Sequence, residues 1–264
     1  MRKSYKRFIS WVLCMFLVVS FFSDVFPAMG APKESRDYVS LVNTWIESNR
    51  GRYFFYNSTR SPFGMISPRP DDSTDGAWGS GYRYNSNSIV GISHIQQWQI
   101  SGLQIMPTAK KTIDPSGGAE SWRTQVDHNK ETAEPGYHQL KLEEYGINLE
   151  LTATDRVAMH RYTYDQAGAS DIFINLSPGN FGEVNIFNAY VEEVGDHHDE
   201  IRGWFTERGV LSYYDTTFYF SIKFDTPYDE LRGWKDGRLT ELTDGKLEGS
   251  GMGVYAHYND LAAD

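Results

Sequence analysis

Apolar and polar positions alternate along the middle of the chain, which predicts β-strands that each bury one face. Between His138 and Tyr145 the apolar positions are Leu140 and Leu142, with polar neighbours on either side. After Gly146 the alternation resumes over residues 147–151. We therefore expect two antiparallel strands joined by a short turn.

The later part of the chain repeats this pattern at short intervals. Asp171–Leu176 reads as a compact apolar strand. Residues 210–214 and 217–224 predict a hairpin whose second strand carries four large apolar side chains on one face: Phe218, Phe220, Ile222 and Phe224. The Asp-Gly pairs at residues 236–237 and 244–245 are turn signals typical of short adjacent strands.

Helical patterns are scarce. Residues 37–50 predict a short helix or helical turn, because Val39, Val42 and Ile46 have helical spacing. No long amphipathic pattern follows, and strands do not alternate with helices. We expect an all-β fold, a large antiparallel β-sandwich with a short N-terminal helix. The polar stretch of residues 110–132 is expected to be a surface loop.

Residues 1–31 have the layout of a secretory signal peptide, which predicts a domain over residues 32–264. A basic start is followed by an apolar run over residues 8–22 and by the small residues Ala28, Gly30 and Ala31. The alternative is an uncleaved membrane anchor, because the run approaches the shortest spanning length. The only cysteine, Cys14, lies in this segment, so the exported domain would have no disulfide. The expected location is secreted or periplasmic.

The net charge of the chain limits the kinds of molecule that it can bind. The formal net charge is −10, and the N-terminal segment holds four of the basic residues. So acidic a domain is repelled by nucleic acid and by anionic membrane surfaces, so we expect no nucleic acid and no membrane after signal cleavage. A neutral ligand such as a sugar is compatible with this charge.

Residues 75–98 gather aromatic side chains between glycines. Trp78 and Tyr82 lie among Gly76, Gly79 and Gly81, and His94 and Trp98 follow. The apolar face of a pyranose can stack on such rings, so sugar binding is one interpretation. The alternative is that these are ordinary core aromatics.

Residues 127–165 concentrate charged groups. Three carboxylates could serve acid–base chemistry (Glu131, Glu134, Asp155), and three cationic side chains could bind an anion (Arg156, His160, Arg161). The alternative is a strand with a solvated charged face. No carboxylate pair can be assigned a glycosidase's geometry from spacing alone.

Two further stretches favour structural interpretations. His197 and His198 are flanked by acids, but adjacent histidines on a strand point to opposite faces, so we interpret them as a solvated loop and predict no metal site. The proline-rich stretch of residues 58–72 is interpreted as a structural loop that packs Phe63 inward.

In their order along the chain, several of these motifs resemble the N-terminal domain of glycoside hydrolase family 92. The resemblance extends from about Tyr38 to Tyr258, and its most specific parts are residues 61–68, 81–94 and 131–164. These contain "SPFGMISP", "GYRYNSNSIVGISH" and "ELTATDRVAMHRYTY". The family consists of calcium-dependent exo-acting α-mannosidases.

The resemblance implies a partner domain and a division of roles. Family members pair this β-sandwich with a C-terminal catalytic helical domain, which supplies the catalytic carboxylates and most of the Ca²⁺ site. We therefore carry over no catalytic residue and expect the chain alone to be inactive on its α-mannoside glycan. A tryptophan before the "SGY" motif contacts sugar in the family and matches Trp78; Tyr82, His94 and Trp98 are further substrate-binding candidates. The alternative is a stand-alone carbohydrate-binding β-sandwich without catalysis.

Overall fold

The computed structural model describes residues 37–46, 48–49, 59–72, 81–97, 100–177, 185–208 and 214–263. The chain divides into two compact units, Met1–Leu41 and Val42–Asp264. In the first unit, the described part holds a 3-10 helix, η1 (Val39–Leu41), whose first amides donate to the Asp37 carboxylate. The predicted N-terminal helix is thus a single short turn. The predicted signal peptide lies outside the described residues.

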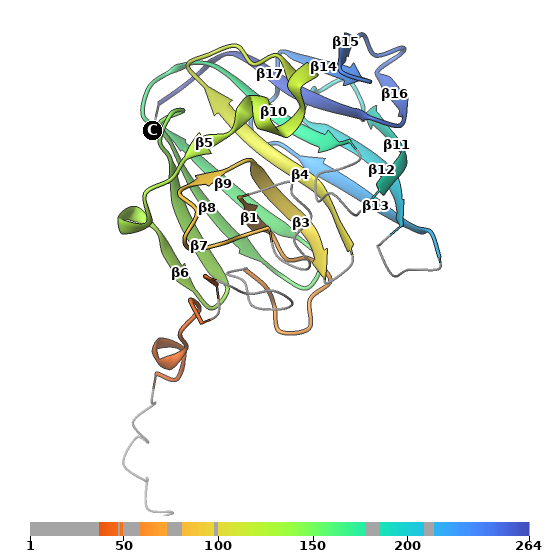
Figure 1. Ribbon diagram of the computed structural model, residues 1–264. Coiled ribbons are helices and arrows are strands. Elements are labelled where there is room, and N and C mark those ends of the chain that lie inside the picture. Colours follow the sequence, from red (N-terminus) through yellow and green to blue (C-terminus); the bar gives the residue numbers. More distant parts are fainter. Residues whose placement is uncertain are drawn as a thin grey trace, which may run out of the picture. The chain divides into compact units, whose positions relative to one another are not determined.

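The second unit is built from antiparallel strands (Figure 1). A seven-stranded sheet has the order β1 (Arg69–Asp71), β3 (Gly91–Gln97), β4 (Ile100–Ala109), β10 (Gly168–Leu176), β17 (Met252–Leu261), β14 (Glu230–Lys235) and β15 (Arg238–Thr240). A four-stranded sheet has the order β13 (Thr216–Lys223), β12 (Glu200–Arg208), β11 (Asn185–Glu193) and β16 (Lys246–Gly249). A second four-stranded sheet has the order β6 (Thr132–Glu134), β7 (Tyr137–Leu142), β8 (Ile147–Ala153) and β9 (Ala158–Tyr164). A small pair joins β2 (Ser88–Ile89) to β5 (Thr124–Gln125).

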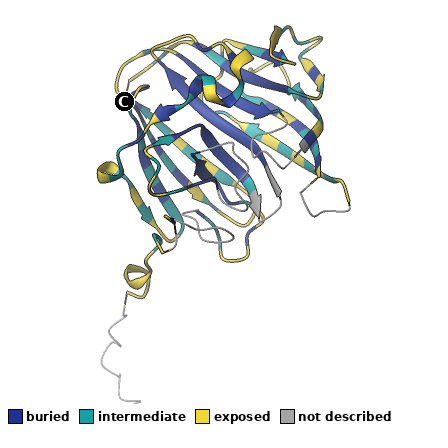
Figure 2. Ribbon diagram, in the orientation of Figure 1, coloured by how far each residue is buried: buried dark blue, intermediate teal, exposed yellow. Residues whose placement is uncertain are grey.

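The seven-stranded sheet buries both faces. On β10, Phe173 packs in one core cluster with the β7–β8 side chains, whereas Ile172 and Ile174 pack in the other with β11 and β12. Successive strand residues point to opposite faces, so the continuous apolar run of β10 reflects burial on both sides. Figure 2 shows these central strands almost wholly buried. The predicted all-β sandwich is confirmed.

The predicted hairpins and turns are largely confirmed. Strands β7 and β8 pair with Leu142 opposite Ile147, and Gly146 lies between them with a φ of 65°. Asp236 and Gly237 both have positive φ, 50° and 69°, as the tight turn between β14 and β15 requires. Strand β13 pairs with β12, whereas residues 210–213 of its predicted partner lie outside the described residues.

Residues 110–132 differ from the predicted surface loop. They contain η2 (Pro115–Trp122), β5 and η3 (His128–Lys130). Trp122 is fully buried; it stacks on Phe173 at 4.8 Å, and its indole nitrogen donates to the Val90 carbonyl at 2.8 Å. The prediction was wrong because a single large side chain fixes a polar stretch to the core. Among the described helices, none is long and apolar enough to span a membrane.

Candidate carbohydrate site

Three segments that are far apart in sequence meet beside β3 and β9. The amide of Met65 donates to the Asp155 carbonyl at 2.7 Å, and the amide of Ser67 donates to the His94 carbonyl at 2.9 Å. These bonds fix the segment before β1 against the β8–β9 turn and against β3. The three segments with the most specific sequence motifs therefore form one region of the fold.

Phe63 does not pack inward, contrary to the sequence interpretation. Its side chain is 97% exposed, and Met65 is 73% exposed. The backbone beneath them is nevertheless held, because the amide of Gly64 donates to the Ser61 carbonyl at 2.9 Å. The loop thus presents large apolar side chains to solvent on a fixed backbone.

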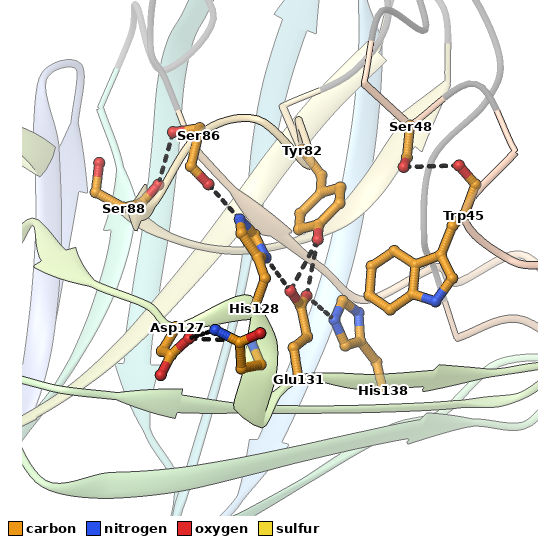
Figure 3. A network of polar contacts seen from close by, with 10 residues as sticks. Trp45, Ser48, Tyr82, Ser86, Ser88, Asp127, His128, Glu131 and His138 are labelled. Atoms are coloured by element: carbon orange, nitrogen blue, oxygen red, sulfur yellow. Dashed lines mark hydrogen bonds and ion pairs between the residues drawn. The ribbon is translucent and has the colours of Figure 1, made fainter.

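A buried carboxylate, Glu131, is the centre of the polar network in Figure 3. Its oxygens accept hydrogen bonds from His138 Nε2 at 2.6 Å and from Tyr82 Oη at 2.9 and 3.0 Å, and a further one from His128 Nδ1. The side chain of Glu131 is 1% exposed. Burial would raise the pKa of Glu131, but the bonds from His138, His128 and Tyr82 outweigh it and hold the pKa below its usual value.

The bonding pattern assigns the protons of both histidines. His128 Nδ1 faces the Glu131 carboxylate and Nε2 faces the Ser86 carbonyl at 2.7 Å. Both partners accept, so both ring nitrogens of His128 are placed to donate hydrogen bonds. His138 donates from Nε2, and its buried Nδ1 has no hydrogen-bond partner among the described residues.

Two aromatic rings form the accessible edge of this network. Tyr84 is 41% exposed and stacks on His128 with ring centroids 4.5 Å apart. Trp45, which is half-buried, meets Tyr84 edge-on at 4.9 Å. An exposed tyrosine and a half-buried tryptophan beside a buried polar network are suited to sugar stacking. Sequence reasoning missed both residues; the "GYRY" motif was the available signal for Tyr84.

His94 and His160 form a second buried network between two sheets. Their Nε2 atoms lie 2.9 Å apart, His94 Nδ1 lies 2.6 Å from the Leu103 carbonyl, and His160 Nδ1 lies 2.7 Å from Tyr162 Oη. Because a carbonyl only accepts, His94 donates from Nδ1 and accepts at Nε2. His160 then donates from Nε2 and accepts from Tyr162, so both rings are neutral.

The acidity of these groups agrees with that assignment. Burial lowers the pKa of His94 to about 4, against the opposing effect of the Leu103 carbonyl. Burial, and then the neighbouring His94, hold the pKa of His160 well below its usual value. Neither ring offers a free nitrogen to a ligand.

Asp71 ends β1 and Asp72 follows it, directly before residues 73–80, the segment that carries Trp78. Burial raises the pKa of Asp71 to about 6, although Arg69 and bonds from Ser93 and Gln104 oppose it. Burial likewise raises the pKa of Asp72 to about 6, against the effect of Arg83. Both carboxyl groups therefore titrate near pH 6, just below neutral pH. They directly precede, in sequence, the segment that carries Trp78.

Of the four residues predicted to bind substrate, the structure describes two. Trp78 and Trp98 lie outside the described residues. Tyr82 and His94 are 2% and 4% exposed, and their polar atoms serve the two networks. Their roles in substrate binding stay predictions.

The charged residues singled out in the sequence fall into internal and exposed side chains. Glu131 and His160 are internal, whereas Glu134 and Asp155 are exposed; Arg161 pairs with Glu150 at 3.4 Å. Residues 195–198, with His197 and His198, form the exposed turn between β11 and β12, as predicted. Among the described residues, no group of three or more histidine, cysteine or acidic side chains could hold a metal ion.

Comparisons with solved structures support the fold described above. The structure is similar to the family GH92 α-mannosidase BT3965 from Bacteroides thetaiotaomicron, solved with mannoimidazole (TM-score 0.75, 20% identity, covering 86% of this chain and 31% of that one). It is also similar to the GH92 family glycosyl hydrolase ccman5 (TM-score 0.69, 22% identity, 84% and 31% covered). A third similar structure is the inverting GH92 mannosidase BT2199 from Bacteroides thetaiotaomicron VPI-5482 (TM-score 0.67, 14% identity, 86% and 30% covered).

The chain therefore spans about a third of the length of these three GH92 proteins. No curated protein matches the sequence. The model of the glycosyl hydrolase family 92 N-terminal domain matches residues 41–264, and the chain belongs to this family.

Proposed function

We propose that this chain is the N-terminal, carbohydrate-contacting domain of a secreted α-mannosidase that acts on α-mannoside glycans. The observation that carries the proposal is the family match over residues 41–264, combined with coverage of only 31% of a related mannosidase. Residues 1–31 would direct export to the periplasm or the cell exterior and would then be removed. Fractionation of expressing cells, with N-terminal sequencing of the product, tests this location and the cleavage site.

The sugar contacts would lie on the aromatic edge beside Glu131. Tyr84 would supply an exposed ring and Trp45 a half-buried one, and Trp78 would add a third from residues 73–80. Tyr82 and His94 would act as positioning residues, because their polar atoms hold the networks beneath. No described carboxylate is assigned a catalytic role.

Calcium is proposed to bind outside the described residues. The family resemblance implies this ion, which prefers several oxygen ligands. The described residues contain no cluster of acidic or histidine side chains that fits it. No step of the proposed function is assigned to calcium within this chain.

A mannose-release assay tests the catalytic part of the proposal. The purified chain of 264 residues should release no mannose from α-mannobiose, with or without calcium, because the catalytic carboxylates are proposed to lie in another domain. Calorimetric titration with methyl α-mannoside should show weak binding that Tyr84→Ala removes, while Tyr219→Ala on β13 leaves it unchanged. Calcium-dependent release would contradict the proposal of an inactive domain. Binding without release by a native product of this length would favour a stand-alone binding module.

A further inference from the structure

A pocket of about 970 Å³ lies between the residue 60–62 segment and the β8–β9 turn. Its walls also include Thr44 and the β6–β7 turn at residues 135–136. This volume is in the range of small-molecule sites. Neither Tyr84 nor Trp45 lines it, so the pocket does not include the aromatic edge assigned to the mannoside.

Hydrogen bonds from all sides hold the walls of this pocket. Ser61 Oγ donates to Asp155 Oδ1 at 2.5 Å, and Thr152 Oγ1 donates to the Gly136 carbonyl at 2.8 Å. Thr44 Oγ1 donates to the Ala133 carbonyl at 2.6 Å. The hydroxyl oxygens keep their capacity to accept, so a preformed cavity presents polar atoms without first having to order its walls.

Two arginines of the lining have no anionic partner among the described residues. Arg60 Nε is buried and makes no hydrogen bond there, and Arg156 forms no ion pair there. A buried polar group without a partner is costly and calls for an explanation. The contrast with other arginines is clear, since Arg161, only five residues along the chain, pairs with Glu150.

The composition of the chain makes these two unpaired arginines unusual. Acidic residues outnumber basic ones, 35 to 25. Asp155, the one acidic residue of the lining, accepts a bond from Ser61. In so acidic a chain, two arginines that line one pocket and form no ion pair with its single carboxylate indicate a site for an external anion.

We propose that this pocket binds a saccharide that carries an oxyanion, a carboxylate or a phosphate, through Arg60 and Arg156. The planar guanidinium group matches both oxyanions with paired hydrogen bonds. The hydroxyls of Thr44, Ser61 and Thr152 accept bonds from sugar hydroxyls, and Val42, Pro62 and Ala153 supply apolar contact. This site is additional to the proposed mannoside contact.

The experiment is an isothermal titration calorimetry measurement in which the full chain is titrated with each of four probes. D-glucuronate represents the sugar carboxylate, D-glucose 6-phosphate the sugar phosphate, inorganic phosphate the bare anion, and methyl α-mannoside the neutral sugar. We expect one of the two anionic sugars to bind at least about tenfold more tightly than the neutral sugar, with an affinity that falls as salt is added. Equal binding of inorganic phosphate and the anionic sugars would overturn the saccharide part of the proposal.

Three variants locate the binding. Arg156→Gln and Arg60→Gln should each weaken the anionic sugar about tenfold or more, because each removes a charged hydrogen-bond donor. Arg161→Gln is the matched control and should leave the affinity unchanged. Arg156 is exposed, so its variant keeps the test valid if Arg60→Gln fails to fold. The proposal is wrong if no anionic probe binds better than methyl α-mannoside, or if all three variants bind alike. Loss of mannoside binding in Tyr84→Ala is a separate result and does not bear on this site.

Discussion

Replacing Glu131 by glutamine would place an amide where three hydrogen-bond donors converge. The carboxylate accepts from His128, His138 and Tyr82. Glutamine removes the charge and turns a donor toward other donors. We expect Glu131→Gln to lower the free energy of unfolding by about 3 kcal/mol, since buried donors lose their charged acceptor and one of them is left unsatisfied.

Urea denaturation of the variant and the parent chain checks this value. Glu134→Gln is the matched control, because Glu134 lies three residues away on β6 and is exposed. Its effect should stay within about 0.5 kcal/mol. A loss below about 1 kcal/mol for Glu131→Gln would show that the network contributes little to stability.

The pair formed by His94 on β3 and His160 on β9 joins two sheets, so its protonation affects how these strands are held together. The folded pKa of His94 is about 4, against about 6.5 in the unfolded chain. Between these values the unfolded state binds more protons than the folded state, so stability falls as pH falls from about 6.5 to about 4. Below about 4 the loss from His94 levels off.

We expect His94→Gln to flatten this profile by about 3 kcal/mol across that window, from the difference between the two pKa values. Glutamine can still donate to the Leu103 carbonyl and accept from His160. The measurement is the free energy of unfolding at several pH values between 4 and 7. His197→Gln, at the exposed β11–β12 turn, is the control and should keep the parent profile. Identical profiles for parent and His94→Gln would refute the assignment of neutral rings.

Sequence patterns predict an element correctly where neighbouring residues alone determine its structure. The β7–β8 hairpin follows from alternation, and the turn at Asp236 and Gly237 from its residue types. The burial of Trp122 could not be predicted, because its partners Val90 and Phe173 lie far from it along the chain. The partners of Glu131 include Tyr82, which lies 49 positions away, so spacing alone could not reveal that network.

In the second unit as a whole, the loop that contains Phe63 and Met65 exposes apolar side chains, although backbone hydrogen bonds fix its position. Phe63 is 97% exposed, and Met65 beside it is anchored through its amide to Asp155. Val157 and Met159, just beyond that anchor, are 61% and 63% exposed. A large exposed apolar patch in a soluble protein marks an interaction surface or a tendency to associate.

We expect the chain to self-associate through this patch, and Phe63→Asp to reduce the association. Sedimentation velocity over a range of protein concentrations measures it. The free energy of unfolding should change by less than about 0.5 kcal/mol, because the Phe63 side chain buries almost nothing in the folded chain. Tyr219→Asp provides the control, since Tyr219 is 79% exposed on β13 but far from this loop in sequence. If both variants associate like the parent chain, the loop is not the contact surface; if both lose association equally, the effect is one of net charge and not of this patch.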